Sequence, residues 1–169
     1  GGAAWGLIPG FLKARFGVNE IITTLMLVYI AIQWVRFWVF GPWSEGGFQQ
    51  SATFPKEAFL PRLTDLASSV PAFGGLTVHL GFLFGLLAAT LIWFLLNRTR
   101  AGFEIRLIGD SPRAARYAGI DIKRAIIVVF VISGALAGLA GMSEVGGVVH
   151  RLQDRISPGY GYTAIIIAY

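Results

Sequence analysis

Long apolar runs separated by polar segments dominate the hydrophobic pattern of the chain. Residues 21–40, 80–96 and 125–142 are almost entirely apolar, and shorter apolar pieces occur at residues 1–12 and 163–169. A run of about 20 residues is what an α-helix needs to cross a hydrocarbon layer of about 30 Å. The pattern therefore predicts an all-α, polytopic transmembrane helical bundle with three complete spans and two partial ones. We expect an internal fragment of a longer polypeptide, cut within membrane segments at both ends.

The segments between the runs differ in character. Residues 41–79 are rich in Gly, Pro and Ser and predict an aqueous loop, with one short interfacial helix near residues 60–69. Residues 146–161 contain several Gly and a Pro that interrupt any helix. Irregular backbone at membrane depth occurs where it is buried in protein or lines a wet cavity. Residues 98–124 form a basic polar connection between two spans.

Composition and charge support a membrane protein and orient it. Hydrophobic residues make up 55% of the chain and charged residues only 14%, against roughly 25% in soluble domains. The net charge of +5 does not predict nucleic-acid binding, because the basic residues flank apolar runs. The predicted connections on one side hold nine Lys and Arg, and those on the other side hold four: Lys56, Arg62, Arg151 and Arg155. The positive-inside rule places segment 98–124 in the cytoplasm and loop 41–79 outside.

A short helix is predicted inside segment 98–124. Asp110 or Ser111 can act as N-cap, Pro112 suits the first helical position, and Gly119 suits the left-handed residue that ends a helix. So short a helix is marginal alone and needs its surroundings or a partner to hold it. Two interpretations stay open: a surface that docks against a partner, or a connector whose arginines are merely solvated.

Small residues recur at helical spacing in the third span. Gly134 and Gly138 are four residues apart, as are Ala137 and Gly141. Small residues one turn apart let helix backbones approach closely in a membrane. We therefore predict that this helix packs tightly among others, although such pairs are common in membrane helices.

A polar-tinged stripe runs along the first full span. Asn19, Thr23, Met26, Ile30 and Gln33 follow one another at steps of three and four residues, so they share a helix face. Thr23, Met26 and Gln33 are candidates for lining a solute path. The more common role of such polar residues is hydrogen bonding to neighbouring helices or to backbone carbonyls.

The remaining polar residues near the membrane have few specific roles. Glu144, at the outer end of the third span, is either interfacial or part of the pathway. Arg36 lies among aromatics near the end of its span, where snorkelling is the favoured role. His79 and His150 have no second ligand at a metal spacing, so no metal site is predicted. The chain has no cysteine and no phosphate-binding G-x-x-x-x-G-K-[ST] loop, so it cannot itself hydrolyse nucleotides.

Three stretches carry a family resemblance. RLIGDSPRAARYAGIDIKRA, SGALAGLAGMSEVGGVVHRL and GYGYTAIIIA resemble the permease subunits of bacterial ATP-binding cassette (ABC) importers in the branched-chain amino acid, ribose and simple-sugar group. The opening GLIPGFLKARFGVNEIITTLMLVYIA fits the nucleoside branch of that group most closely. Relatives in this branch often carry Asn before the Tyr of the first full span, where this chain has Val28 before Tyr29.

The resemblance implies a role for the predicted short helix. In the family, the matching element is a coupling helix that docks into a groove on the ATPase subunit. The positions that match or surround it are Gly109, Pro112, Arg113, Ala114, Ala115, Arg116, Tyr117, Gly119 and Ile120.

The resemblance also implies an assembly. Residues 1–169 would be part of a single permease domain of about ten helices in the bacterial inner membrane. Two permease subunits, of the same or a sister chain, would form the pathway. Two ATP-binding cassette ATPase subunits would lie below them, and an extracytoplasmic solute-binding protein would deliver a nucleoside or simple sugar. The chain itself would need no cofactor and catalyse no covalent change.

Two other functions remain as alternatives. One is a secondary transporter driven by an ion gradient, with a broken helix at residues 146–161 and Glu144 as the coupling acid. The other is an intramembrane enzyme, which lacks any nucleophile–base or metal constellation in this sequence.

Overall fold

The computed structural model describes residues 1–44, 46–47, 50–61, 80–154, 156 and 159. This part of the chain is mostly helical, and its only β-type pairings are the isolated bridges Ser44–Ser51 and Gln50–Gln153. The partial span expected at residues 163–169 lies outside the described residues, as does nearly all of the interfacial helix expected near residues 60–69.

The helices follow the predicted apolar runs and add one helix in the basic connection. Among the described residues, three stretches are long and apolar enough to cross a membrane: Glu20–Phe40, Leu80–Arg98 and Ile122–Val149. In chain order the helical elements are α1 (Gly2–Phe16), α2 (Glu20–Phe40), the 3₁₀ turn η1 (Lys56–Ala58), α3 (Leu80–Arg98), α4 (Arg100–Asp110), α5 (Pro112–Tyr117), α6 (Ile122–Glu144) and the π-helix η4 (Val145–Val149).

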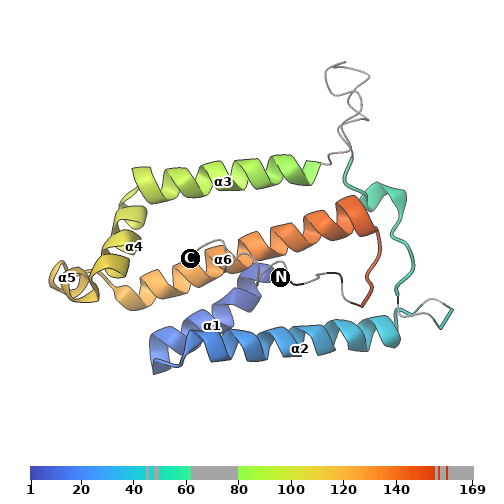
Figure 1. Cartoon of the computed structure of the whole chain (residues 1–169), viewed down its shortest axis with the longest axis horizontal. Coiled ribbons are helices and arrows are strands. Elements are labelled where there is room, and N and C mark those ends of the chain that lie inside the picture. Colours follow the sequence, from blue (N-terminus) through green and yellow to red (C-terminus); the bar gives the residue numbers. More distant parts are fainter. Residues whose placement is uncertain (45, 48–49, 62–79, 155, 157–158, 160–169) are drawn as a thin grey trace, which may run out of the picture.

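The long helices α2, α3 and α6 run roughly parallel to one another, so their ends lie at two opposite ends of the molecule. Figure 1 shows α3, α6 and α2 running lengthwise, with α4 and α5 together at one end, where they join α3 to α6. Helix α1 packs against α6 over much of its length. The short turn η1 lies at the opposite end from α5. The basic connection and the described part of loop 41–79, which we call the outer loop, are therefore at opposite ends of the helices, as a membrane-spanning arrangement requires.

Local signals fix the turn between α1 and α2. Gly17 ends α1 in the left-handed conformation, with φ 67°. The side chain of Asn19 caps α2, because its Oδ1 accepts a hydrogen bond from the Ile21 amide at 2.9 Å. Lys13 forms an ion pair with Glu20 across the turn. Asn19 is thus the N-cap of α2, as a polar residue directly before an apolar helical run indicates.

The described helices bury little of their apolar surface in one another. Tyr29, Trp34 and Phe37 on α2 are exposed, as are Phe82 and Leu87 on α3. Exposed apolar surface on this scale is unfavourable in water. It is suited to contact with lipid or with further membrane helices.

Candidate functional site

Helix α5 is defined by matched signals at both ends. Its N-cap is Ser111, whose Oγ accepts a hydrogen bond from the Ala114 amide at 3.3 Å. At the other end Gly119 has φ 75°, its amide donates to the Arg116 carbonyl at 3.1 Å, and the Ile120 amide donates to the Ala115 carbonyl at 3.0 Å. These are the two hydrogen bonds of a Schellman C-cap. The capped helix predicted from sequence is therefore confirmed, with Ser111 rather than Asp110 as N-cap.

The two sides of α5 have opposite surroundings. Ala115 is fully buried, and α5 contacts α4 and α6. Tyr117, two residues further, is 94% exposed. Ala115 is therefore packed inside its own chain and cannot contact a partner. The ring of Tyr117 is exposed and available for contact with one. The other exposed positions predicted for coupling are Gly109, Pro112, Arg113, Ala114, Arg116 and Gly119, and Ile120 is partly buried.

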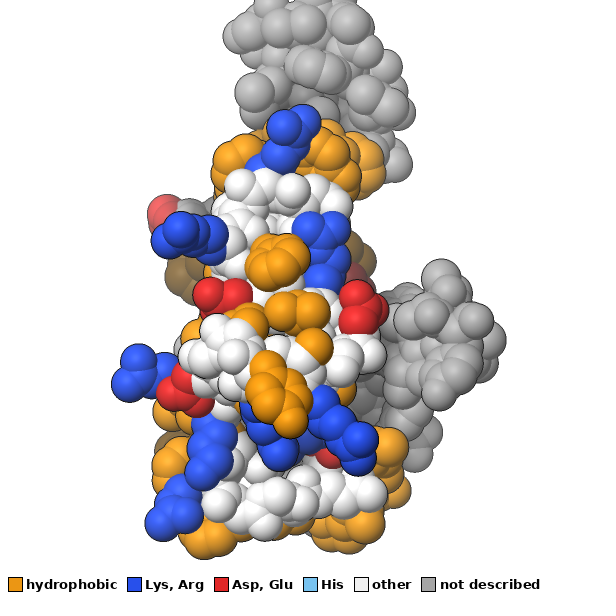
Figure 2. Space-filling view, turned by 90° about the vertical axis from the view of Figure 1, so that its left-hand side faces the viewer, with side chains coloured by type: hydrophobic (Ala, Val, Ile, Leu, Met, Phe, Trp, Pro, Cys, Tyr) orange, Lys and Arg blue, Asp and Glu red, His pale blue; other side chains and the backbone are white. Residues whose placement is uncertain are grey.

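The end of the molecule that carries α5 is basic. Figure 2 shows this end, where Lys and Arg side chains are spread over the surface with several Asp and Glu side chains among them. Segment 98–124 holds seven Lys and Arg and three Asp and Glu. Arg113 and Arg116 are both exposed on α5 itself. A basic, aromatic surface of this kind favours a partner whose facing surface is acidic and offers an apolar recess.

Sequence reasoning missed helix α4. Thr99 caps it, because its Oγ1 accepts a hydrogen bond from the Gly102 amide at 3.2 Å. Gly102 makes the corner with α3 possible, since a Cβ there would lie 2.5 Å from the Cα of Leu96. The available signal was a Thr N-cap followed by apolar Phe103 and Leu107 four residues apart. This signal is weak inside a charged stretch.

Glycines bring the backbones of α1 and α6 into contact. Gly2, Gly6 and Gly10 are four residues apart on α1, and each faces α6. A Cβ on Gly2 would lie 2.8 Å from the Cα of Gly138, and one on Gly134 would lie 3.0 Å from the Cα of Gly6. No side chain fits there, so the two helices form one tightly packed unit.

The four small residues predicted on the third span have different surroundings. Gly134 and Gly138 face α1, and Ala137 lines a cavity among α1, α2 and α6. A Cβ on Gly141 would have no neighbour within 4 Å in the described chain. The packing face of α6 thus contacts α1. The glycine stripe of α1 was not singled out from the sequence.

The structure does not bring the predicted pathway residues together. The hydroxyl of Thr23 donates a hydrogen bond to the carbonyl of Asn19 at 2.9 Å, which is the back-bonding considered from the sequence. Met26 is 60% exposed and Gln33 lies on an exposed part of α2. Glu144 lines a separate groove between α3 and α6. These residues therefore do not form one site within the described chain.

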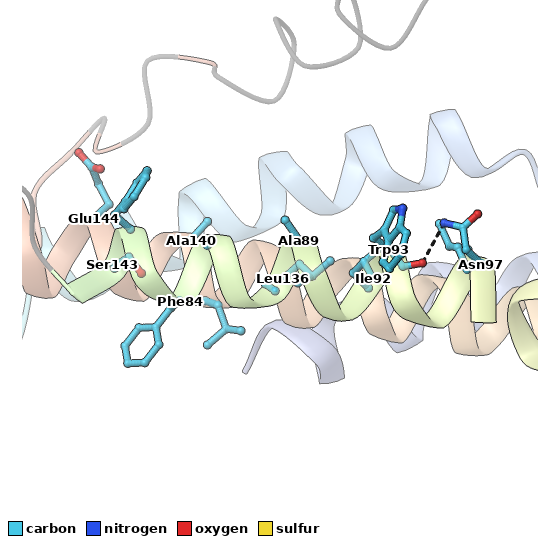
Figure 3. Close-up of a pocket in the computed structure, with 15 residues that line it drawn as sticks. Phe84, Ala89, Ile92, Trp93, Asn97, Leu136, Ala140, Ser143 and Glu144 are labelled. Atoms are coloured by element: carbon cyan, nitrogen blue, oxygen red, sulfur yellow. Dashed lines mark hydrogen bonds between the residues drawn. The ribbon is translucent and has the colours of Figure 1, made fainter. Parts of the chain in front are cut away.

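The groove between α3 and α6 is mostly apolar. It encloses about 880 Å³. Figure 3 shows Ser143 and Glu144 at one end of this groove, and Trp93 and Asn97 at the other. The side-chain amide of Asn97 donates a hydrogen bond to the backbone carbonyl of Trp93 at 2.9 Å. The groove thus has a carboxylate at the C-terminal end of α6 and apolar walls between.

The cavity among α1, α2 and α6 is smaller, about 570 Å³. Its lining combines the rings of Trp5 and Trp34 with the hydroxyl-bearing Thr24 and Ser133. The Thr24 hydroxyl is engaged by backbone carbonyls of its own helix. Neither cavity gathers metal ligands, since the described residues contain no group of three or more His, Cys, Asp or Glu that could hold a metal ion.

Sequence reasoning also missed an ion pair near the C-terminal end of α2. The Arg36 Nε donates to Asp154 Oδ1 at 2.9 Å, and Arg36 Nη2 donates to Asp154 Oδ2 at 3.1 Å. Snorkelling was the favoured role for Arg36, but the side chain has an acidic partner 118 positions away in the sequence. No local pattern signals such a pair.

Comparisons with known proteins give one consistent result. A family model described as the permease component of a branched-chain amino acid transport system matches residues 1–169. The chain is 39% identical, over 99% of its length, to the glucose ABC transporter permease protein of Haloferax volcanii, and 35% identical, over 99%, to the guanosine ABC transporter permease protein of Bacillus subtilis. It is 32% identical, over 95%, to the nucleoside ABC transporter permease protein of Lactococcus lactis subsp. cremoris.

The matched region is a part of each relative. It covers 45%, 47% and 41% of these three proteins, so the chain spans about half their length. No solved structure matches the chain.

Proposed function

Because the chain belongs to the branched-chain amino acid transport system permease family, we propose that it forms part of the permease subunit of an ATP-driven importer. Its three apolar helices make it part of a multi-pass membrane protein. The permease moves solute and performs no covalent chemistry, and ATP hydrolysis takes place on a separate ATPase subunit. The relatives named for glucose, guanosine and nucleoside support a nucleoside or a simple sugar as the solute.

The assembly in this proposal contains three kinds of partner. A second permease subunit completes the pathway, ATPase subunits bind at the basic end, and an extracytoplasmic solute-binding protein delivers the solute at the opposite end. The full permease has about ten helices and lies in the cell membrane. In cells with two membranes, this is the inner one. The positive-inside rule supports the cytoplasmic placement of α4 and α5.

In this proposal α5 receives the movement of the ATPase. The observation that carries it is the exposure of Tyr117, Arg113 and Arg116 on one helix. The other side of this helix packs on its own chain through the buried Ala115. A helix of six residues is too short to be rigid alone. Burial of Ala115 and the two caps supply the rigidity that a docking element needs.

Movement of α5 passes directly into α6. The reversal between them is short, and Asp121 caps α6 by accepting hydrogen bonds from the Lys123 amide at 3.1 Å and the Arg124 amide at 3.2 Å. Because α1 and α6 touch backbone to backbone, they move together. A push on α5 therefore displaces a two-helix unit rather than a single side chain.

The test replaces Tyr117 in the full-length permease, reconstituted with its ATPase and binding protein. Tyr117→Ala removes the exposed ring without touching the packed side of α5, so we expect solute-stimulated ATP hydrolysis to fall at least tenfold while the permease still accumulates in the membrane. Loss of an aromatic anchor at an interface is typically worth about 2 kcal/mol or more. The measurement is ATPase rate with nucleosides, ribose and other simple sugars tested separately.

Tyr117→Phe is the matched control, since it keeps the ring and should keep most of the stimulation. Unchanged ATPase stimulation in Tyr117→Ala would contradict the docking role. Solute uptake that survives collapse of the ion gradients, with ATP supplied, excludes the secondary-transporter alternative. Uptake that requires those gradients would instead favour it, with Glu144 and the π-helix η4 as its broken-helix site.

A further inference from the structure

After α6 ends, the chain crosses from α6 to α2. We call residues 145–154 the crossing segment. Its last residue, Asp154, accepts hydrogen bonds from Arg36 Nε at 2.9 Å and from Arg36 Nη2 at 3.1 Å. Both carboxylate oxygens are engaged, which is the two-pronged geometry that orients a guanidinium and a carboxylate relative to each other. The chain therefore leaves the crossing segment beside the C-terminal part of α2.

The crossing segment is also attached to the outer loop. Three of its carbonyls accept hydrogen bonds from amides of that loop: Gly146 from Leu60 at 2.9 Å, His150 from Phe54 at 3.0 Å and Leu152 from Ser51 at 2.8 Å. The His150 ring packs edge-on against the Phe59 ring, with centroids 3.9 Å apart. The route of the chain from α6 to α2 is therefore set by contacts along the whole segment and not by one ion pair.

The position of Asp154 limits where the next predicted span begins. That span starts at Thr163, nine residues after Asp154, and lies outside the described residues. Nine residues reach at most about 30 Å when fully extended. Gly159, within this connection, has φ 99°, a conformation typical of turns, which shortens the reach. The span therefore enters the membrane near the C-terminal part of α2.

The cavity among α1, α2 and α6 is the space closest to that point. Trp34 and Val35, the two residues before Arg36, both line it. Among the described residues, those that line the groove between α3 and α6 belong to these two helices alone. Asp154 is thus held next to the first cavity and is separated from the second by α6.

The cavity is elongated in the direction of the helices. Its lining on α2 runs from Thr24 to Val35, and its lining on α6 runs from Phe130 to Gly138. At about 1.5 Å per residue these walls are roughly 16 Å and 12 Å long. A space of this length suits two to three turns of a helix that lies alongside α2 and α6.

The walls of the cavity are apolar and accessible. Trp34 is 63% exposed and Val28 is 43% exposed, both on α2. On α6, the small residues Ser133 and Ala137 are four residues apart and both exposed. Small residues one turn apart allow a second helix to approach closely. The α6 wall is therefore shaped for a helix backbone.

The segment at residues 163–169 has a matching face. Its sequence, TAIIIAY, contains no charged residue, and Ala164 and Ala168 are four residues apart. On a helix these two alanines share one face, and Ile166 lies on the opposite side. A pair of small residues on each of two helices permits close packing between them.

We propose that the span predicted to begin at Thr163 occupies the cavity among α1, α2 and α6, with the face of Ala164 and Ala168 packed on Ser133 and Ala137 of α6. It runs antiparallel to α2 and α6, because both of these helices end where the crossing segment lies (Figure 1). The inference concerns the packing of the chain and does not depend on the importer function.

The test joins the two faces by a cross-link. In the full-length permease, with any cysteine outside the printed sequence replaced, Ala137→Cys is combined with Ala164→Cys or with Ala168→Cys. The printed chain contains no cysteine of its own. A short bifunctional methanethiosulfonate reagent is added to membranes, and cross-linked peptides are quantified by mass spectrometry. We expect at least one of the two pairs to be joined in most molecules.

Ala89→Cys on α3 is the matched control. Ala89 is also an exposed alanine of a long apolar helix, but it lines the groove between α3 and α6. Combined with Ala164→Cys or Ala168→Cys, it should give at least tenfold less product than Ala137→Cys. As much product from Ala89→Cys would overturn the proposal and favour the other groove. Absence of product from both positions would overturn it too, and would leave the cavity to lipid or solute.

Two further variants test the face and the occupant. Ile166→Cys, combined with Ala137→Cys, should give at least tenfold less product than the better alanine position, and an equal yield would contradict the alanine face. Ala137→Cys alone should give no product of twice the subunit mass. Such a product in good yield would assign this surface to a second copy of the permease and exclude the span from it.

Discussion

Ala115 and Tyr117 are two residues apart on α5 and have opposite roles in the structure. Ala115 is fully buried and Tyr117 is 94% exposed. From the sequence, both alanines of the RAARY stretch were grouped with the surface that approaches a partner. The distinction matters for experiments, because a large or charged residue at position 115 disrupts the packing of α5 on its own chain. Only changes at exposed positions such as Tyr117 test docking itself.

Gly119 gives a prediction at the residue scale. Its φ of 75° lies in the left-handed region, where a side chain costs roughly 1–2 kcal/mol. Gly119→Ala should therefore lower the free energy of unfolding of the full-length permease by about 1 kcal/mol, measured by thermal unfolding in detergent.

Gly109 provides the matched control for that change. It lies in α4, its φ is ordinary, and a Cβ there would meet nothing within 4 Å. Gly109→Ala should leave stability unchanged or raise it by up to about 1 kcal/mol, because alanine favours helix over glycine. Equal losses from both variants would contradict the assignment of Gly119 as the C-cap.

At the scale of elements, the pairing of α1 with α6 is the tightest contact of the described chain. Gly134→Val should separate the two helices, since even a Cβ at this position would collide with the backbone of α1. Overpacking of this kind costs about 1–3 kcal/mol, or more where backbone blocks relaxation. We expect a lower midpoint of thermal unfolding and reduced accumulation of the full-length protein.

Gly141→Val tests whether this loss is specific to the interface. Gly141 lies on the same helix, and a Cβ there meets nothing within 4 Å of the described chain. The variant should therefore unfold close to the wild-type temperature. If it unfolds as early as Gly134→Val, general intolerance of α6 to valine explains both results, and the α1 contact does not.

Several elements could be predicted because their signals are local. The length of an apolar run indicates a spanning helix, and Asn19, Ser111 and Gly119 mark helix ends through hydrogen bonds made within a few residues. Helix α4 was not predicted because its charged residues resemble those of a polar connection. Its local signals, the N-cap Thr99 and the four-residue spacing of Phe103 and Leu107, are weak inside a charged stretch.

Other features depend on pairs that are distant in the sequence. The glycine stripe of α1 becomes an interface only when it meets Gly134 and Gly138, and Arg36 acquires its meaning from Asp154. The stripe through Thr23 and Gln33 was placed on one helix face by geometry alone. Which neighbours cover that face is a property of tertiary packing, so its role as a pathway stays a prediction.

At the scale of the whole molecule, the two ends of the helix bundle should face opposite sides of the membrane. Tyr117 at the basic end and Lys56 in the outer loop are both exposed. In otherwise cysteine-free full-length protein, Lys56→Cys should react with a membrane-impermeant thiol reagent added to intact cells. Tyr117→Cys should react only after the membrane is permeabilised.

The reverse pattern of labelling would invert the orientation and remove α5 from contact with a cytoplasmic ATPase. Labelling of both positions in intact cells would contradict a spanning arrangement of α3, because this helix lies between the two sites in the chain. The outcome is therefore informative about the topology independently of any transport measurement.

The glycine contact between α1 and α6 also sets an order of events during synthesis. Gly2 and Gly134 are separated by about 130 residues of chain, and ribosomes add roughly 5–20 residues per second. Helix α1 thus enters the bilayer about 7–26 s before its partner exists. During that interval the glycine face of α1 has no α6 to cover it, so this face meets lipid or the insertion machinery.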